Sequence, residues 1–250
     1  MNSWQKLPRT RSEPMKVAVI NYCGTVGKTT IAAHLLAPRI SEARIYAVET
    51  INETAGDLGL DIQKMKGDKF GKLYKELLMA ENAIIDVGAS NVEEFIDRMI
   101  KFEESHLEFD YFIVPVTSGG KEQKETLKTI QALAGVGVEP NKIRVAFNRV
   151  DTDVADEFAP ILGYAKTTKN CIANPDAAIY ENEVFNLLSA KKTTITAVVQ
   201  DETDYKALLK GLDKDADKKK AAHYADMHAV KGLARGVNRQ LDAVFAALFA

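Results

Sequence analysis

The chain has 250 residues, of which 46% are hydrophobic, and this length and composition suit one large globular domain or one domain with an appendage. Its 33 basic and 35 acidic residues leave a net charge of −2, which excludes attraction to nucleic acid by a field spread over the whole surface. Two cysteines cannot form a disulfide framework and fit a reducing compartment, and no apolar run approaches the roughly 20 residues that span a bilayer, so we expect a soluble, cytoplasmic protein.

The first fourteen residues are polar and contain no apolar run. A secretory signal needs such a run, so we expect residues 1–14 to form a flexible extension instead. Met15 stands directly before the first apolar segment and is a candidate physiological start.

Short apolar runs alternate with helical patterns over the first 150 residues. We expect strands over residues 17–20, 44–49, 82–87, 111–116 and 143–147, and helices over 31–40, 69–79, 92–102 and 122–133. Near-continuous apolar strands that alternate with helices are typical of a sheet covered on both faces. The sequence therefore predicts an α/β fold with a doubly wound, mostly parallel sheet.

After about residue 164 the chain becomes more polar and more helical. Between residues 221 and 250 an apolar side chain recurs every three or four positions, which predicts one long helix with an apolar stripe: Val230, Leu233, Val237, Leu241, Val244 and Leu248. We expect this stripe to pack on the preceding domain or on a partner subunit. Lysines at 191–192 and 218–220 are expected to lie on solvated faces, with non-specific DNA contact as the alternative.

Residues 17–30, VAVINYCGTVGKTT, predict a buried strand, a tight loop and a helix that opens on Gly27-Lys28-Thr29. Loops of this kind bind phosphate through backbone N–H groups and the positive helix end, while the lysine adds a full charge and the threonine hydroxyl holds Mg²⁺. Tyr22 stands where the pattern G-x-x-x-x-G-K-[ST] has its first glycine, so the prediction depends on the strand–loop–helix context. The expected phosphate-binding residues are Gly24, Thr25, Val26, Gly27, Lys28, Thr29 and Thr30.

Polar residues also follow the ends of the other predicted strands, namely Glu49, Asp86, Thr117 and Asn148. Ligands of parallel sheets bind outside the carboxyl ends of the strands, so these residues are expected to share one edge with the loop. An acid at position 86 would order Mg²⁺ or sense the terminal phosphate. The alternative is a turn or helix cap, because Gly-Ala-Ser follows at 88–90.

Asn148 begins the string Asn-Arg-Val-Asp at residues 148–151. An asparagine amide has both a donor and an acceptor and so can bind the edge of a purine base. Asp151 makes the string similar to the N-K-x-D that binds guanine, which leaves ATP and GTP both open, and an Asx turn is the structural alternative. None of the four histidines stands at ligand spacing from a cysteine or another histidine, so no protein-built metal site is expected.

The order of these motifs resembles the ParA/MinD class of P-loop ATPases. Within that class, residues 19–40 (VINYCGTVGKTTIAAHLLAPRI) and 48–52 (VETIN) are similar to StbB, a ParA-like group from plasmid stability operons that is also linked to conjugation. The resemblance covers residues 15–185. It implies a P-loop nucleotide-binding domain over 15–190, followed by a helical region over 191–250 that packs on the domain or on a partner.

The resemblance further implies binding of ATP and Mg²⁺, weak ATPase activity, a homodimer, and nucleotide-gated binding to DNA or to a small plasmid-encoded DNA-binding protein. By position it implies catalytic roles for Lys28, Glu49 and Asp86. It implies that Thr29 and Asp86 bind the metal ion and that Asn148 and Pro175 bind the base. Pro175 belongs to the segment Ala-Asn-Pro-Asp at 173–176, which resembles the loop that packs against the base.

Two positions depart from the class. The lysine of its K-G-G-x-G-K-T motif falls at Cys23, and a water-orienting aspartate falls at Ile51. In relatives that lysine stabilises charge on the phosphates of the partner subunit. The sequence thus leaves two alternatives to a slow ATPase switch: a nucleotide-binding scaffold without significant hydrolysis, and a metabolic enzyme of the same fold, such as an amidoligase or a small-molecule kinase.

Overall fold

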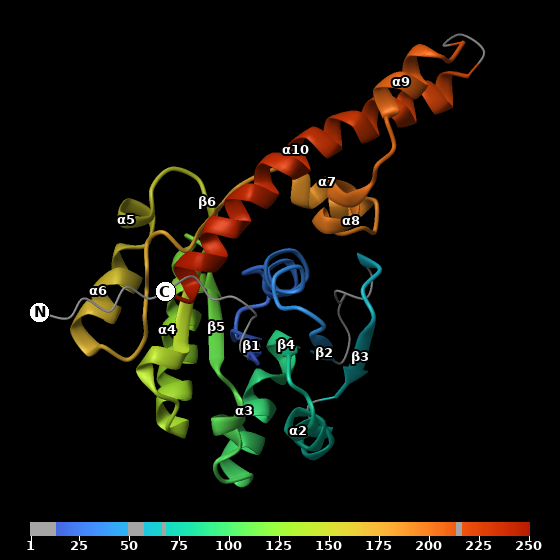
Figure 1. Cartoon of the computed structure of the whole chain (residues 1–250). Coiled ribbons are helices and arrows are strands. Elements are labelled where there is room, and N and C mark those ends of the chain that lie inside the picture. The colour runs from blue at the N-terminus through green and yellow to red at the C-terminus, as the bar shows by residue number, and fades with distance from the viewer. Residues whose placement is uncertain (1–13, 50–57, 67–68, 214–216) are drawn as a thin grey trace, which may run out of the picture.

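The structure is a computed structural model that describes residues 14–49, 58–66, 69–213 and 217–250. Seven parallel strands form one sheet in the order β3-β2-β4-β1-β5-β6-β7 (Figure 1). The strands are β1 (Lys16–Ile20), β2 (Arg44–Val48), β3 (Ile62–Met65), β4 (Ala83–Val87), β5 (Tyr111–Val116), β6 (Ile143–Val150) and β7 (Ala178–Tyr180). The predicted extension over residues 1–14 lies outside the described residues except for Pro14.

The central strands are apolar because helices cover both of their faces. In β1, Ala18 and Ile20 point into one hydrophobic cluster, while Val17 and Val19 point into a second cluster on the other face. All five predicted strands are present. Two further strands were missed, β3 and β7. Both lie at the edges of the sheet. β3 carries exposed polar side chains and so gives no apolar run, and the apolar run of β7 is only three residues long.

The helices form two layers. On one face lie α2 (Phe70–Met79), α3 (Val92–Lys101), α4 (Gly120–Val136) and α6 (Ala159–Thr168). On the other lie the π-helix η1 (Ile31–Leu36), which continues α1 (Lys28–Thr30), together with α7 (Val184–Ala190), α8 (Ile195–Gln200) and α10 (Lys218–Leu248). The shorter elements are η4 (Ala89–Asn91), η5 (Ser105–Glu108), η6 (Pro140–Lys142), α5 (Val154–Glu157) and α9 (Tyr205–Lys210).

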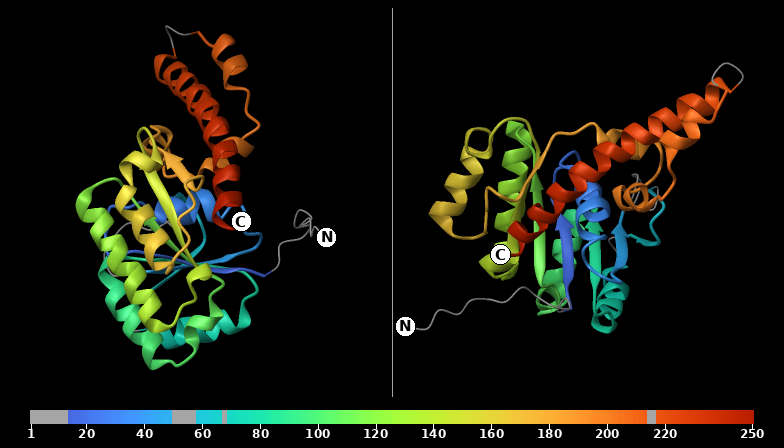
Figure 2. Two further views of the ribbon diagram at one scale, coloured as in Figure 1. Left: turned by 90° about the vertical axis from the view of Figure 1, so that its left-hand side faces the viewer. Right: turned by 45° about the horizontal axis from the view of Figure 1, so that its top comes forward.

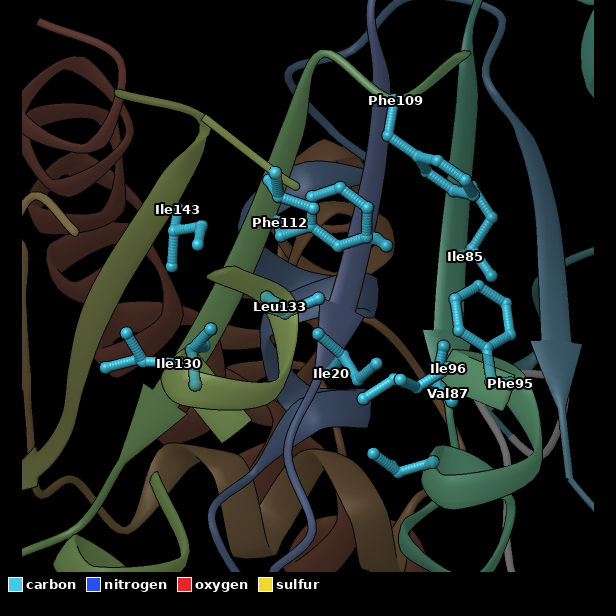
Figure 3. Close-up of a cluster of buried hydrophobic side chains, with 14 of the residues drawn as sticks. Ile20, Ile85, Val87, Phe95, Ile96, Phe109, Phe112, Ile130, Leu133 and Ile143 are labelled. Atoms are coloured by element: carbon cyan, nitrogen blue, oxygen red, sulfur yellow. The ribbon is translucent and has the colours of Figure 1, made fainter. Parts of the chain in front are cut away.

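The first layer packs on the sheet through a cluster rich in aromatic rings (Figure 3). The rings of Phe109 and Phe112 lie 4.9 Å apart between centroids, and Phe95 lies 6.1 Å from Phe109. All three are fully buried beside Ile20 and Ile85 of the central strands. Burying one such side chain contributes roughly 1.5–3 kcal/mol, so this cluster holds the strands in the register that the site needs.

The apolar stripe of α10 packs on the domain itself. Five of its six predicted residues are buried and Leu233 is half-buried, all in the cluster that also contains η1 and β1. Arg39 fixes the helix in place: its Nη2 donates to the carbonyl oxygen of Asn238 at 2.8 Å and its Nε donates to Asp242 at 3.0 Å. The other end of α10 extends away from the sheet together with α9 (Figures 1 and 2). No helix in the described part of the chain is both long enough and apolar enough to span a bilayer.

Truncating Leu241 tests this packing. Because its side chain is 2% exposed, we expect Leu241→Ala to lower the free energy of unfolding by about 2–5 kcal/mol, the usual cost of such a cavity. Urea denaturation followed by circular dichroism measures the change. The matched control is Leu208→Ala in α9, whose side chain is 43% exposed, and which should change the value by less than about 0.5 kcal/mol. Equal effects would contradict the packing of α10.

Candidate functional site

The loop between β1 and α1 depends on a glycine that touches another strand. Gly27 has a φ of 83°, which is the left-handed region, and a Cβ at this position would lie 2.2 Å from Nδ2 of Asn148. That amide nitrogen donates to the carbonyl oxygen of Val26 at 2.9 Å. Asn148 lies near the end of β6 and is only 3% exposed. It supports the loop through this buried hydrogen bond.

Asn21 anchors the other side of the loop. Its amide nitrogen donates to the carbonyl oxygen of Pro115 and to Oγ1 of Thr126, both at 2.7 Å, and its Oδ1 accepts the backbone N–H of Cys23 at 2.8 Å. The residue is fully buried, and its bonds tie the loop to β5 and α4. We did not identify Asn21 from the sequence, although an amide residue at the end of an apolar strand was a usable signal.

Lys28 is folded into the loop. Its Nζ donates to the carbonyl oxygens of Cys23 at 2.6 Å and Asn21 at 3.1 Å, and the residue is only 5% exposed. Burial lowers the pKa of the ammonium group, while the nearby acids, Asp86 first among them, oppose that shift. The carbonyl groups that hold this ammonium group are neutral, whereas phosphate oxygens are negatively charged. The ammonium group is therefore well placed to bind phosphate.

Thr29 and Asp86 meet at the mouth of the loop, where Oγ1 of Thr29 donates to Oδ2 of Asp86 at 2.8 Å. Asp86 is 5% exposed, and burial raises the pKa of its carboxyl group to about 6. The bond from Thr29 and the charge of Lys28 act against this rise, whereas Glu49 adds to it. Strands β1 and β4 bring the pair together. Asp86 of β4 is in register with Val19 of β1, and the loop that leads to Thr29 follows β1.

Glu49 follows β2 and reaches the same edge of the sheet. A Cβ at Gly88 would lie 1.8 Å from Oε2 of Glu49, so the carboxylate passes directly over the backbone after β4. Only glycine leaves room for this approach. Two carboxylates, from Glu49 and Asp86, therefore face the loop from neighbouring strand ends.

A cavity of about 580 Å³ opens above these groups. Most of the residues predicted for the site line it: Gly24, Thr25, Gly27, Lys28, Thr29, Thr30, Glu49 and Asp86. Val26 and Asn148 are not in the lining; they are buried beneath the loop.

Pro175 is also not among the lining residues. Its segment precedes β7, whereas the site is formed by residues at the carboxyl ends of strands, and Nδ2 of Asn174 donates to the carbonyl oxygen of Ala247 at the end of α10. The structure therefore does not bring Pro175 together with the other predicted residues. Ile51 lies outside the described residues.

The far wall of the cavity was missed by the sequence reasoning. Its residues come from η1, from the segment before β3, from η4 and the residue before it, from β6, and from α7 and the segment after it: His34, Leu58, Gly88, Ala89, Arg149, Phe185, Ser189 and Lys192. Phe185, Ser189 and Lys192 stand in no motif and are brought to the loop by the packing of the C-terminal helices.

His34 joins this wall to the helix that starts at the loop. Its Nδ1 accepts the backbone N–H of Ile195 at 3.2 Å, and its ring centroid lies 5.7 Å from that of Phe185. Burial lowers the pKa of His34 to about 4, so the ring is neutral at pH 7 and acts as an acceptor. Across the described residues, no group of three or more histidine, cysteine and acidic side chains is arranged to hold a metal ion.

Comparisons with known proteins extend these findings. No family model matches the sequence, and no curated protein matches it. The solved structure of the septum site-determining protein MinD with Mg-ADP from Pyrococcus horikoshii is similar at a TM-score of 0.54 and 14% identity, over 85% of this chain and 93% of that chain. A chain of the MinC:MinD cell division complex from Aquifex aeolicus has a TM-score of 0.54 and 13% identity, over 89% and 95%.

The cell division ATPase MinD of Pyrococcus furiosus gives the same result, with a TM-score of 0.53, 13% identity, and coverage of 87% of this chain and 98% of that chain. Identities this low establish a shared architecture and nothing finer. The chain has the fold of MinD. The predicted doubly wound P-loop fold is therefore confirmed, including a parallel sheet with helices on both faces and a C-terminal helix.

The raised pKa of Asp86 predicts a pH-dependent stability. The folded protein binds this proton up to about pH 6, whereas the unfolded chain releases it near 3.8, so stability falls as pH rises between these values. We expect Asp86→Asn to remove this dependence and, without Mg²⁺ or nucleotide, to raise the free energy of unfolding at pH 7.5 by up to about 3 kcal/mol. Urea denaturation at pH 4 and pH 7.5 measures it.

The control is Asp176→Asn, at an exposed position, which should leave the pH dependence unchanged. Parallel pH curves for the wild type and Asp86→Asn, or a lower stability of Asp86→Asn at pH 7.5, would contradict this account of the buried carboxyl group.

Proposed function

We propose that this protein is an ATP-binding switch of the ParA/MinD class that acts in plasmid stability, partition or conjugative transfer, as the StbB group does. The observation that carries the proposal is the hydrogen bond between Thr29 and Asp86 at the mouth of a loop that holds Lys28. A hydroxyl, a carboxylate and a cation beside free backbone N–H groups are what binding of a nucleotide with Mg²⁺ requires.

The loop residues fit a phosphate chain. Gly24 is exposed, and a Cβ there would meet nothing closer than Ala89 at 3.9 Å, so the backbone is open to a ligand. Lys28 would exchange its bonds with loop carbonyls for bonds with phosphate oxygens. The cavity of about 580 Å³ is within the range of roughly 300–1,000 Å³ found for small-molecule sites.

Thr29 and Asp86 supply the oxygen atoms that we propose bind Mg²⁺. Mg²⁺ prefers a few protein oxygens completed by water and phosphate, and Thr29 and Asp86 offer a hydroxyl and a carboxylate at one point. Glu49 lies in the same cavity and would act on the coordinated water. Because Mg²⁺ must displace the proton of Asp86, its affinity should fall as pH drops below about 6.

ATP is the nucleotide we propose. The guanine alternative depended on Asp151, which is exposed and is not among the residues that line the cavity. Its backbone N–H instead donates to Oε1 of Glu157 at 2.9 Å within the turn after β6. Asn148 contributes by holding the loop, and Arg149 is the residue from this string that reaches the cavity.

Slow hydrolysis is proposed rather than fast turnover, and a scaffold without hydrolysis is the second candidate. Cys23 supports the proposal against fast turnover, because it is 7% exposed and its Sγ lies 3.4 Å from Oγ1 of Thr25, where it supplies no positive charge; the same observation is the ground for the scaffold. A homodimer and a small plasmid-encoded DNA-binding partner are proposed from the resemblance to the class.

The central test is ATP binding by Lys28→Ala. Removing charge-assisted bonds to phosphate should weaken binding about 10- to 100-fold, as judged by equilibrium dialysis with labelled ATP and Mg²⁺. Lys166→Ala, at an exposed position on α6, is the matched control and should bind like the wild type. Circular dichroism of both variants checks that they are folded. Equal affinity of Lys28→Ala and the wild type would show that the loop is not a phosphate site.

Steady-state phosphate release separates the slow ATPase from the scaffold. We expect the wild type to release phosphate slowly from ATP and Lys28→Ala to show only background, because the cation that binds the phosphates is lost. Wild-type release equal to that of Lys28→Ala, with ATP binding intact, would support the scaffold. Size-exclusion chromatography with and without ATP and Mg²⁺ on the same samples shows whether nucleotide controls assembly.

A further inference from the structure

Two adjacent lysines at the end of α7 have different environments. Nζ of Lys191 forms a close ion pair with Asp226 on α10. Lys191 also lines a second cavity, which lies between α8 and α10. Lys192 instead lines the cavity above the phosphate loop. Among the described residues no carboxylate lies within ion-pair distance of Lys192, so its charge is not committed to another side chain.

The backbone at Lys192 has an unfavourable conformation for a lysine. Its N–H donates to the carbonyl oxygen of Ser189 at 3.0 Å, and the N–H of Thr193 donates to that of Leu188 at 3.1 Å. This is the Schellman arrangement that ends a helix, and its left-handed residue is usually glycine. Lys192 has a φ of 50°, which lies in the left-handed region that is unfavourable for a residue with a Cβ.

A second non-glycine residue that lines this cavity also has a left-handed backbone conformation. Five non-glycine residues among those described have positive φ, and two of them, Arg149 and Lys192, line the cavity. Both are cations. Arg149 already lies 3.9 Å from Glu181, and Lys28 is bonded to loop carbonyls. Lys192 is thus the cation of this wall that has no partner among the described side chains.

The wall that carries Lys192 is fixed to the loop. Three residues further on, the N–H of Ile195 is bonded to His34 on η1, and Leu188 of α7 is fully buried. On the other side, a Cβ on Gly59 would lie 3.9 Å from the carbonyl oxygen of Lys192, so the backbone of Lys192 lies beside the segment that precedes β3. Lys192 therefore lines the same cavity as the loop, and it does so on a segment that is hydrogen-bonded to η1.

We propose that Lys192 is a second phosphate-binding cation, supplied by the same subunit, that faces the nucleotide from the wall opposite Lys28. The inference rests on the proposed nucleotide site and adds a phosphate-binding residue to it. The bound phosphates would lie between two ammonium groups, one fixed in the loop and one on the α7 wall, so the C-terminal helices would be part of the binding site rather than a support for it.

The test compares Lys192→Gln with Lys191→Gln, its neighbour. We expect Lys192→Gln to weaken binding of ATP with Mg²⁺ about tenfold or more, measured by equilibrium dialysis, whereas Lys191→Gln should bind like the wild type. Lys192→Arg should restore most of the affinity. Because the contact is between charges, the difference between wild type and Lys192→Gln should shrink as salt is raised.

A further variant separates charge from folding. Lys192→Gly should raise the midpoint of thermal unfolding, since glycine accepts the left-handed backbone without strain, and should still lose ATP affinity. Normal ATP binding by both Lys192→Gln and Lys192→Gly, together with loss of binding in Lys28→Ala, would overturn the role of Lys192 and leave the proposed function standing. Normal binding by Lys28→Ala as well would overturn the nucleotide site itself.

Discussion

Lys28 brings a full positive charge into a place where its side chain is almost entirely excluded from water, and its nearest partners are two backbone carbonyl oxygens. Desolvating an ammonium group is costly, and carbonyl dipoles offset only part of that cost. The remaining imbalance is reduced by the carboxylates of Asp86 and Glu49, which raise the pKa of the lysine toward its normal value. The same imbalance makes the loop selective for anions, because a phosphate supplies the missing charge at short range.

This arrangement requires a loop that does not relax around the lysine. Two buried amides provide the rigidity: Asn21 ties the start of the loop to β5 and α4, and Asn148 ties its end to β6. Each is satisfied by hydrogen bonds, so the cost of burying it is offset. Replacing either by an apolar residue would leave carbonyl or N–H groups of the loop without partners. The phosphate loop is therefore held by β5 and β6, the two strands that follow β1 on one side of the sheet, together with α4.

The sequence sufficed to predict the fold and the parts of the site that depend on local pattern. Apolar runs identified the five inner strands, and Gly27-Lys28-Thr29 identified the loop, because strand, turn and helix signals there agree within fourteen residues. It did not identify β3, whose exposed polar residues interrupt the apolar pattern, or β7, whose apolar run has only three residues. Pro175 was selected by its Ala-Asn-Pro-Asp string, but the register of β7 against β6 begins only at Ala178, so the string precedes the strand end. The α7 wall depends on contacts between residues more than 150 positions apart, as between His34 and Ile195, and no local pattern records such contacts.

The helix after the loop links these two halves of the site. η1 begins directly after Thr30, and it carries both His34, which accepts a bond from Ile195, and the residues that pack under α10. Its π-helical turns widen the backbone, a feature that is rare and usually associated with function. Arg39, just beyond η1, donates to Asn238 and Asp242 of α10. Any movement of α1 and η1 when phosphate binds must therefore shift α8 and α10 or break these bonds. Since α10 continues past the sheet into the segment that extends with α9, the helix after the loop is in contact with the same long helix that forms this outer segment.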